Sequence, residues 1–149
     1  MSGRLVLEWG VRDTLLQYLE RSADFEAQVR DGAVYRAGRG IELPLARHAD
    51  GTLRATGSVV LRAHGGALTV PLVGVVLDGA ALWIDDPVDG PGARMPLVTL
   101  AEPVREEAPE RGGGVVRYRT ALAAQADVLF MYNYVPGAPF APLFVREEG

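Results

Sequence analysis

The 149-residue sequence lacks cysteine and lysine altogether. Without cysteine there is no disulfide, no thiolate metal site, no iron–sulfur cluster and no cysteine nucleophile. Without lysine there is no P-loop lysine, no Schiff-base amine and no lysine general base. All 15 basic residues are therefore arginine, and codon bias in a GC-rich genome is the simplest explanation of that usage. The two absences exclude several enzyme and cofactor classes before any motif is considered.

Long apolar runs and a surplus of positive charge are also missing. The 15 basic residues face 19 acidic ones, a formal net charge of −4, so a nucleic-acid partner is not expected. The longest apolar stretch, residues 68–82, is interrupted by Pro71, Gly74 and Asp78 and predicts no membrane helix. The first apolar run is broken by Glu8 and is too short for the core of a signal peptide. We therefore expect a cytoplasmic protein from the sequence as it stands, or the trimmed form of an exported one.

Composition and hydrophobic patterning predict a mainly β fold. Hydrophobic residues make up 48% of the chain and charged residues 23%, as in globular proteins, and the length suits one domain over residues 1–149. The 18 glycines and 10 prolines favour many turns and short strands. Alternating apolar and polar residues predict strands at 41–45, 53–63 and 68–72. We expect an antiparallel, β-sandwich-like fold.

A few segments depart from this alternation. Apolar residues recur at helical spacing from Trp9 to Glu20, which predicts an α-helix. The segment from Ala121 to Phe130 is ambiguous, so the expected fold has one or two short α-helices. The stretch from Glu102 to Gly114 combines neighbouring glutamates and arginines with three consecutive glycines, and we expect a mobile surface excursion there.

Two histidines and one helical tyrosine are the side chains best suited to chemistry. His48 precedes a turn, whereas His64 ends a strand on its polar face, directly before two glycines. Tyr18 shares a helix face with Thr14, one turn earlier. The ordinary alternatives are an exposed histidine and a core tyrosine whose hydroxyl finds one partner. No serine has the context of a nucleophile elbow, so a hydrolase triad has no support.

Three blocks of the sequence resemble the HtaA family of haem-binding domains. Residues 7–19, LEWGVRDTLLQYL, are similar to the family's opening motif, a tryptophan-glycine followed by a short helix that carries a hydroxyl residue and, four positions on, a tyrosine. Residues 57–68, GSVVLRAHGGAL, resemble its second block, a strand that starts at glycine and ends in histidine-glycine before an apolar strand. Residues 130–142 are similar to a third block, an aromatic strand that leads into a tyrosine and a turn of proline and glycine. The blocks occur in family order and span nearly the whole chain.

The resemblance implies that the chain binds ferric haem b through a tyrosinate. In the family the helix tyrosine is the axial iron ligand and the strand histidine hydrogen-bonds its oxygen, and these roles fall on Tyr18 and His64. The hydroxyl that contacts a haem propionate falls on Thr14, where the family usually has serine. In the C-terminal pair, a second propionate contact falls on Tyr134, and the ring that faces the porphyrin falls on Asn133.

Asn133 departs from the family pattern because it is not aromatic. Phe130 and Tyr132 are the neighbouring rings that would take over its contact with the porphyrin. The macrocycle needs an apolar slot, and Leu15, Leu19 and the aromatic residues of the tail would line it.

Three classes of function follow from the sequence. The leading hypothesis is a non-enzymatic haem-binding domain for transport, transfer or buffering, with a haem donor or acceptor protein as its partner. A haem-dependent enzyme, either a peroxidase or a haem-degrading protein, would need a distal acid–base residue, and His64 is not free for that task if it serves Tyr18. A β-sandwich interaction domain that has lost haem binding is the third hypothesis. Family members are typically exported and associated with a membrane or cell wall, whereas neither a signal nor an anchor is evident in this sequence.

Overall fold

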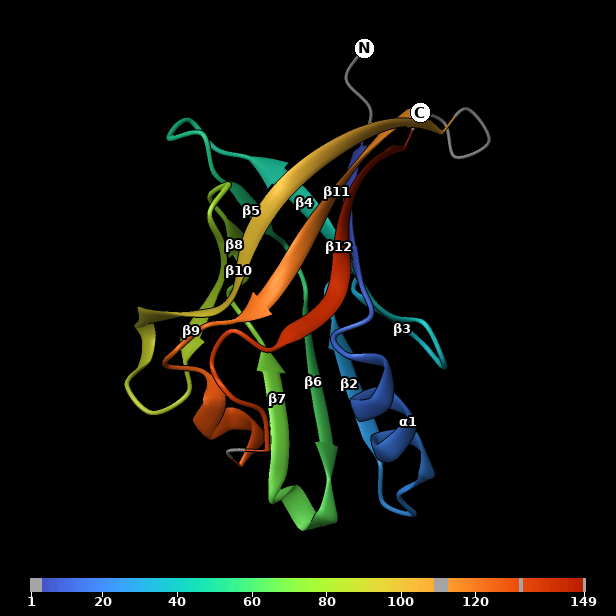
Figure 1. The fold of residues 1–149 in the computed structure, drawn as a ribbon, viewed down its shortest axis with the longest axis vertical. Helices are drawn as coiled ribbons and strands as arrows, with labels where there is room; N and C mark the ends of the chain where they lie inside the picture. Colours follow the sequence, from blue (N-terminus) through green and yellow to red (C-terminus); the bar gives the residue numbers. More distant parts are fainter. Residues whose placement is uncertain (1–3, 109–112, 132, 149) are drawn as a thin grey trace.

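The computed structural model describes residues 4–108, 113–131 and 133–148 (Figure 1). The strands, in chain order, are β1 (Arg4–Trp9), β2 (Glu26–Arg30), β3 (Val34–Arg36), β4 (Gly40–Arg47), β5 (Leu53–Ala55), β6 (Ser58–Ala63), β7 (Leu68–Leu72), β8 (Val76–Leu77), β9 (Ala81–Asp86), β10 (Gly90–Ala108), β11 (Gly113–Leu122) and β12 (Pro139–Glu148). The helical segments are α1 (Asp13–Arg21) and the 3₁₀ turns η1 (His64–Gly66) and η3 (Asp127–Phe130). Within these ranges, no helix combines the length and apolar character needed to cross a bilayer.

The main sheet closes on itself because β1 has a hydrogen-bonded neighbour on each side. The order runs β1-β12-β11-β10-β9-β8-β5-β4, and β4 pairs back onto β1, which gives a closed antiparallel barrel of eight strands. β3 pairs with the first residues of β4, outside this circuit. β2, β6 and β7 form a separate three-stranded antiparallel sheet, which extends from one end of the barrel (Figure 1).

Apolar side chains from the barrel, the smaller sheet and α1 form one core. The largest of the fully buried side chains are Trp9, Phe130, Leu7, Leu19, Ile41, Leu43, Leu61, Leu72, Leu82, Ile84, Leu97 and Leu143. Removing this apolar surface from water is the main force that stabilises the fold. The indole N–H of Trp9 donates to the carbonyl of Ala141 at 2.8 Å, so the polar atom of the bulkiest core side chain is satisfied.

A buried arginine offsets the repulsion between two glutamates at the seam where the barrel closes. Glu8 of β1 and Glu42 of β4 lie directly opposite each other, an arrangement that destabilises a strand pair. Arg146 of β12 is only 9% exposed; it donates to Glu8 at 2.5 Å and lies 3.8 Å from Glu42. Arg36 of β3 also pairs with Glu42. The seam therefore carries a charge arrangement that spans β12, β1, β4 and β3.

The predicted mainly antiparallel β structure with a helix is confirmed, but its arrangement is more specific than a sandwich. The long-range pairing of β1 with β4 closes the sheet into a barrel. The α-helix begins later than the sequence pattern indicates, because Trp9 belongs to β1 and the buried Val11 adopts a left-handed conformation (φ 57°) that turns the chain. Residues 121–130 contribute the end of β11 and the 3₁₀ turn η3, so α1 is the one α-helix in the described ranges.

The predicted strand at 53–63 is two strands that belong to different sheets. β5 lies in the barrel and β6 in the smaller sheet, and the chain passes between them at Gly57. A Cβ at Gly57 would lie 2.5 Å from the carbonyl oxygen of Arg30, so only glycine fits where the two segments approach.

The predicted surface excursion over residues 102–114 is exposed as expected, but where the structure describes that segment it forms strands and not a loop. β10 continues through its first half and β11 begins at its end, while residues 109–112 lie outside the described ranges. The charged side chains lie across from each other on the two strands: Arg117 is 3.8 Å from Glu106, and Arg119 is 3.4 Å from Glu102. The acidic and basic residues that suggested a solvated loop are therefore neighbours in a β-ladder.

Gly40 provides a test of how closely β1 and β4 must approach at the seam. Its φ is +114°, and a Cβ there would lie 2.3 Å from the Trp9 carbonyl oxygen. We expect Gly40→Ala to lower the free energy of unfolding by about 2–4 kcal/mol, through left-handed strain and steric clash. Gly51→Ala is the matched control, because Gly51 has φ +86° but no atom within 4 Å of an added Cβ. Its loss should be about 1 kcal/mol. Urea unfolding followed by tryptophan fluorescence compares the two, and equal losses would contradict the prediction.

Candidate functional site

One pocket is bounded by three chain segments that are distant in sequence. They are α1, the turn between β6 and β7, and the segment that follows η3; Figure 1 shows α1 and η3 on opposite sides of the β6–β7 hairpin. The pocket has a volume of about 500 Å³, within the range of roughly 300–1,000 Å³ typical of small-molecule sites. Its lining consists of Thr14, Leu15, Tyr18, His64, Ala67, Leu68, Phe130, Met131, Asn133 and Tyr134. The structure thus brings together Tyr18, His64, Thr14 and Tyr134, the four residues to which the resemblance assigns haem contacts.

Tyr18 and His64 are in ring contact at one wall of this pocket. The helix α1 buries Leu15, Leu16 and Leu19 against the core, which leaves Tyr18 53% exposed on the pocket side. The ring centroids of Tyr18 and His64 are 5.3 Å apart, and the ring planes are tilted by 47°. Tyr18 is therefore not the core tyrosine that its place on an apolar helix face would suggest. Its phenol stands beside an imidazole instead.

Two hydrogen bonds hold the helix that carries Tyr18. The hydroxyl of Tyr35 donates to a carboxylate oxygen of Glu20 at 2.6 Å, and the N–H of Gly38 donates to the same oxygen at 2.8 Å. Burial, together with the Glu20 carboxylate, raises the pKa of Tyr35 above its ordinary value, so this phenol remains protonated and acts as a donor. Because Glu20 lies two residues after Tyr18, these contacts limit rotation of α1 about its axis.

The backbone at His64 is strained, and Asp24 stabilises it. His64 has φ 55°, a left-handed conformation that costs a non-glycine residue about 1–2 kcal/mol. The Asp24 carboxylate accepts the N–H of Gly65 at 2.6 Å and the N–H of His64 at 3.0 Å. These two hydrogen bonds, the one from Gly65 foremost, lower the pKa of Asp24. Asp24 lies in the loop between α1 and β2, so it links the segment that carries the tyrosine to the turn that carries the histidine.

Polar groups gather at the end of the pocket next to β1 and β12. Thr14 is exposed in the first turn of α1. Tyr134 is half-buried and packs edge-on against Phe130 and Phe140, with ring centroids 5.8 and 5.5 Å apart. The backbone N–H of Asn133 donates to the carbonyl of Phe130 at 3.0 Å, and its side chain lines the pocket. Thr14, Asn133 and Tyr134 are therefore the polar residues at this end of the pocket lining.

Apolar side chains supply the remaining wall. Leu15, Leu68 and Phe130 are at most 5% exposed, so their positions are set by the core behind them. Met131 is 55% exposed and lies at the mouth. Leu19, which the sequence suggested as a wall residue, is fully buried in the core instead.

Some features of the site have no signal in the sequence. Asp24 is 40 residues from His64, and no motif connects them. Met131 has a left-handed backbone (φ 55°) that only the folded chain reveals. Of the aromatic alternatives to Asn133, Phe130 lines the pocket, whereas Tyr132 lies outside the described residues.

The side chains that line the pocket can supply few metal ligands, which favours a metal that is already coordinated by another group when it binds. The described lining offers the phenol oxygens of Tyr18 and Tyr134, the imidazole of His64 and the thioether of Met131, and it contains no carboxylate. No cluster of three or more histidine, aspartate or glutamate side chains that could hold a bare ion occurs in the described part of the chain. A phenol oxygen is a hard ligand suited to Fe(III). A phenol in contact with an imidazole, at the wall of a largely apolar pocket, suits a metalloporphyrin better than a free ion.

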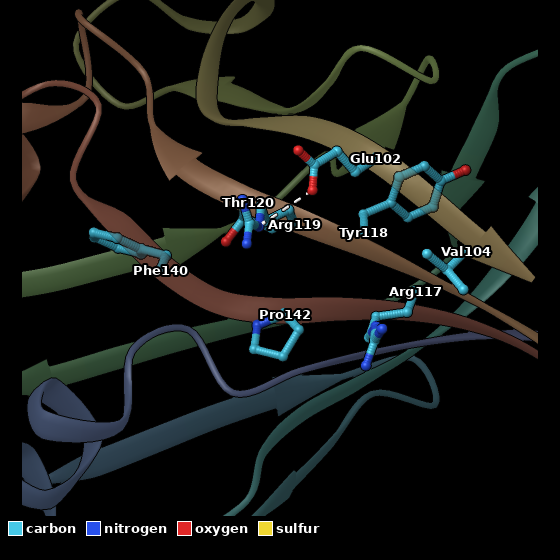
Figure 2. A pocket seen from close by; sticks show the side chains of 8 residues that line it. All are labelled: Glu102, Val104, Arg117, Tyr118, Arg119, Thr120, Phe140 and Pro142. Carbon is cyan, nitrogen blue, oxygen red and sulfur yellow. Dashed lines mark ion pairs between the residues drawn. The ribbon is translucent and has the colours of Figure 1, made fainter.

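A second hollow, of about 390 Å³, lies over β10, β11 and β12 (Figure 2). Its lining consists of Glu102, Val104, Arg117, Tyr118, Arg119, Thr120, Phe140 and Pro142. Figure 2 shows Glu102 and Arg119 directed toward each other, 3.4 Å apart. Glu102 lies at a β-bulge between Ala101 and Val104, with φ 51°. Since its charged side chains are exposed and already paired across the strands, the pocket at α1 is the better candidate.

Solved structures with the same fold match nearly the whole chain. The C-terminal domain of HtaA from Corynebacterium glutamicum matches with a TM-score of 0.69 and 19% identity, covering 99% of this chain and 98% of that domain. The N-terminal domain of HtaA from the same organism has a TM-score of 0.65 and 17% identity, with 100% and 99% covered. The heme-binding protein HtaB of that organism has a TM-score of 0.63 and 17% identity, with 95% and 92% covered. No protein-family model and no curated protein matches the sequence. The resemblance to HtaA-type domains is therefore confirmed for the fold.

Asp24→Asn tests whether a surface carboxylate maintains the turn at His64. The amide can accept only one of the two N–H groups, so we expect a lower free energy of unfolding at neutral pH. Because the folded-state pKa of Asp24 lies below its ordinary 3.8, its stabilising effect is present above that value and is lost as the pH falls through the folded pKa. The difference between variant and wild type should therefore shrink in acid. Urea unfolding from about pH 7 to about pH 3 measures it. Asp89→Asn, an exposed position between β9 and β10, is the control; a difference that does not change with pH would contradict the prediction.

Proposed function

We propose that this protein binds ferric haem, with the Tyr18 phenolate oxygen as the axial ligand of the iron. The observation that carries the proposal is the contact between the rings of Tyr18 and His64, 5.3 Å apart, at the wall of an apolar pocket of about 500 Å³. A phenol beside an imidazole, with no carboxylate among the described lining residues, suits a tyrosinate that a histidine stabilises. The shared fold with HtaB, a heme-binding protein, supports the same ligand class.

His64 acts on the oxygen of Tyr18 in this proposal. Its imidazole donates a hydrogen bond to that oxygen, which orients the ligand and favours the anionic form. The hydrogen bonds from the backbone of His64 and Gly65 to Asp24 keep the ring in place. Bound ferric haem supplies a hard Lewis-acidic iron that prefers an anionic oxygen ligand.

The rest of the pocket holds the porphyrin. The hydroxyls of Thr14 and Tyr134 hydrogen-bond the propionates at the polar end, as the resemblance to the HtaA family implies. Leu15 and Phe130 exclude water from one face of the macrocycle, since both are nearly fully buried at the pocket wall. Phe130 also provides the aromatic contact that the family pattern would place at Asn133.

We infer a role in transport, transfer or buffering rather than in catalysis. Tyr18 and Met131 are more than half exposed, so the pocket is open on one side and a bound haem can pass to another protein. His64 contacts Tyr18 and is engaged there. The chain's second histidine, His48, lies in the turn after β4 and does not line the pocket, so it cannot act as a distal acid–base group. The partner class that follows is a haem donor or acceptor protein.

Tyr18→Phe is the direct test of the axial ligand, because it removes one oxygen and keeps the ring. Titration of wild type with ferric haem should give a sharpened Soret band and the charge-transfer bands of high-spin tyrosinate-bound iron. In Tyr18→Phe those bands should disappear, and the affinity should fall by more than the roughly 10–100-fold that loss of an outer hydrogen-bond partner causes. Tyr118→Phe, in a different hollow, is the matched control and should bind as wild type does. A wild-type spectrum equal to that of free haem would refute the proposal.

His64→Ala should weaken haem binding without abolishing it. Only the hydrogen bond to the ligand oxygen is lost, so we expect a decrease in affinity of about 10–100-fold with the charge-transfer bands shifted but present. His48→Ala, the same substitution outside the pocket, serves as the control. Unchanged affinity in His64→Ala would show that the imidazole does not assist the phenolate.

A further inference from the structure

Arg12 lies beside the polar end of the pocket and pairs with no carboxylate of the described residues. Its guanidinium carbon is 4.6 Å from the ring centroid of Tyr134 and 5.8 Å from that of Phe140. Its Nη1 donates to the carbonyl of Pro139. None of the ion pairs within the described ranges involves Arg12. Two ring faces and a carbonyl therefore hold a positive charge in place without neutralising it.

One nitrogen of this guanidinium lacks an acceptor. Nε of Arg12 is buried and forms no hydrogen bond with any described residue. A buried N–H of a charged group is costly when it has no acceptor. A guanidinium presents its donors in a planar fork that matches the two oxygens of a carboxylate. Nε itself is out of reach of a ligand in this conformation, whereas Nη2 has no hydrogen bond to a described residue and is not among the buried unpaired atoms. Arg12 thus retains, through Nη2, the capacity to bind an anionic group.

A shallow groove connects Arg12 with the pocket. The groove has a volume of about 270 Å³ and runs along Arg12, Asp13, Thr14 and residues 139–142. Thr14 lines both the groove and the pocket, so the two hollows meet at its side chain. The one carboxylate in the groove belongs to Asp13, whose Oδ1 is directed toward Gly10, 3.7 Å from the position of a Cβ there.

The start of α1 adds to the positive potential at this point. Arg12 is the N-cap residue, and its side chain forms no capping hydrogen bond, so the backbone N–H groups of the first turn are not satisfied by a side-chain cap. Such a helix end attracts an anion through its exposed N–H groups and the helix dipole. The guanidinium and the helix N-terminus therefore act on the same groove.

We propose that Arg12 makes the site selective for ligands that carry a carboxylate arm. The flat apolar body of the ligand lies in the pocket, and its carboxylate extends past Thr14 into the groove, where it pairs with Arg12. The inference rests on the proposed function, and for haem the arm is a propionate. Arg12 is then a specificity-determining residue that distinguishes a porphyrin with free carboxylates from one without them.

The test combines two ligands with substitutions at one position. Ferric haem and its dimethyl ester are titrated in the same detergent-containing buffer, and the Soret band gives both affinities. We expect wild type to bind the free acid about tenfold more tightly than the ester. Arg12→Gln should remove this preference by weakening only the binding of the acid. Arg12→Lys should retain part of it, because lysine keeps the charge without the fork. Arg30→Gln, at an exposed position on β2, changes the charge equally and should keep the full preference.

The outcomes separate the inference from the function on which it rests. If Arg12→Gln weakens both ligands equally, Arg12 acts only by supporting Tyr134, and the inference is overturned. A wild type that shows Tyr18-dependent bands with both ligands but no preference overturns it as well, and leaves haem binding standing. If wild type binds neither ligand through Tyr18, the proposed function fails and the inference with it. Circular dichroism and urea midpoints of each variant establish that its fold is intact.

Discussion

Closure of the barrel at β1 is the constraint on which the rest of the structure depends. β1 pairs over six residues with β12 and over five with β4, two strands that lie far from it in sequence. The buried Arg146 forms ion pairs with both Glu8 and Glu42 and so offsets the repulsion between these two carboxylates at the seam. The helix α1 follows β1 directly, and the segment that carries Tyr134 leads directly into β12. β1 and β12 therefore position two walls of the candidate site.

An aromatic series joins the core of the protein to the wall of the pocket. Trp9 stacks on Phe140 at 6.4 Å, Phe140 packs edge-on against Phe130 at 5.2 Å, and Tyr134 contacts both phenylalanines. The stability of the core and the shape of the pocket thus depend on the same side chains, so a substitution at Phe130 would affect both. Tyr18 and His64 differ in this respect, because they are exposed and the core does not rest on them.

The sequence correctly predicts those features of the fold and the site whose physical cause is local. Alternation of apolar and polar residues identified the β character, and the motif likeness singled out Tyr18 and His64, which line one pocket. Pairing between strands depends on contacts between residues that are far apart in the chain. The closure of the sheet into a barrel therefore cannot be predicted from the local sequence pattern. The break between β5 and β6 at Gly57 could not be predicted either, because it depends on the close approach of the backbone at Arg30, the end of β2. Asp24 belongs to no motif, and the motif around residues 7–19 assigns no role to Arg12. Their contacts are with backbone N–H groups and ring faces that only the folded chain brings near them.

The walls of the pocket come from two different sheets, so the position of His64 and the positions of Thr14 and Tyr134 can change independently. Thr14 follows β1 and Tyr134 precedes β12, and these two strands are paired. The backbone pairing of β1 with β12 therefore sets how far apart the two residues lie. His64 stands on a hairpin of the other sheet and is linked to the α1 segment by the exposed carboxylate of Asp24. Substitutions in that loop would alter the approach of imidazole to phenol and leave in place the walls made by α1 and by the segment after η3. The fold thus separates the contact between phenol and imidazole, which depends on the loop at Asp24, from the pocket walls that the strands of the barrel position.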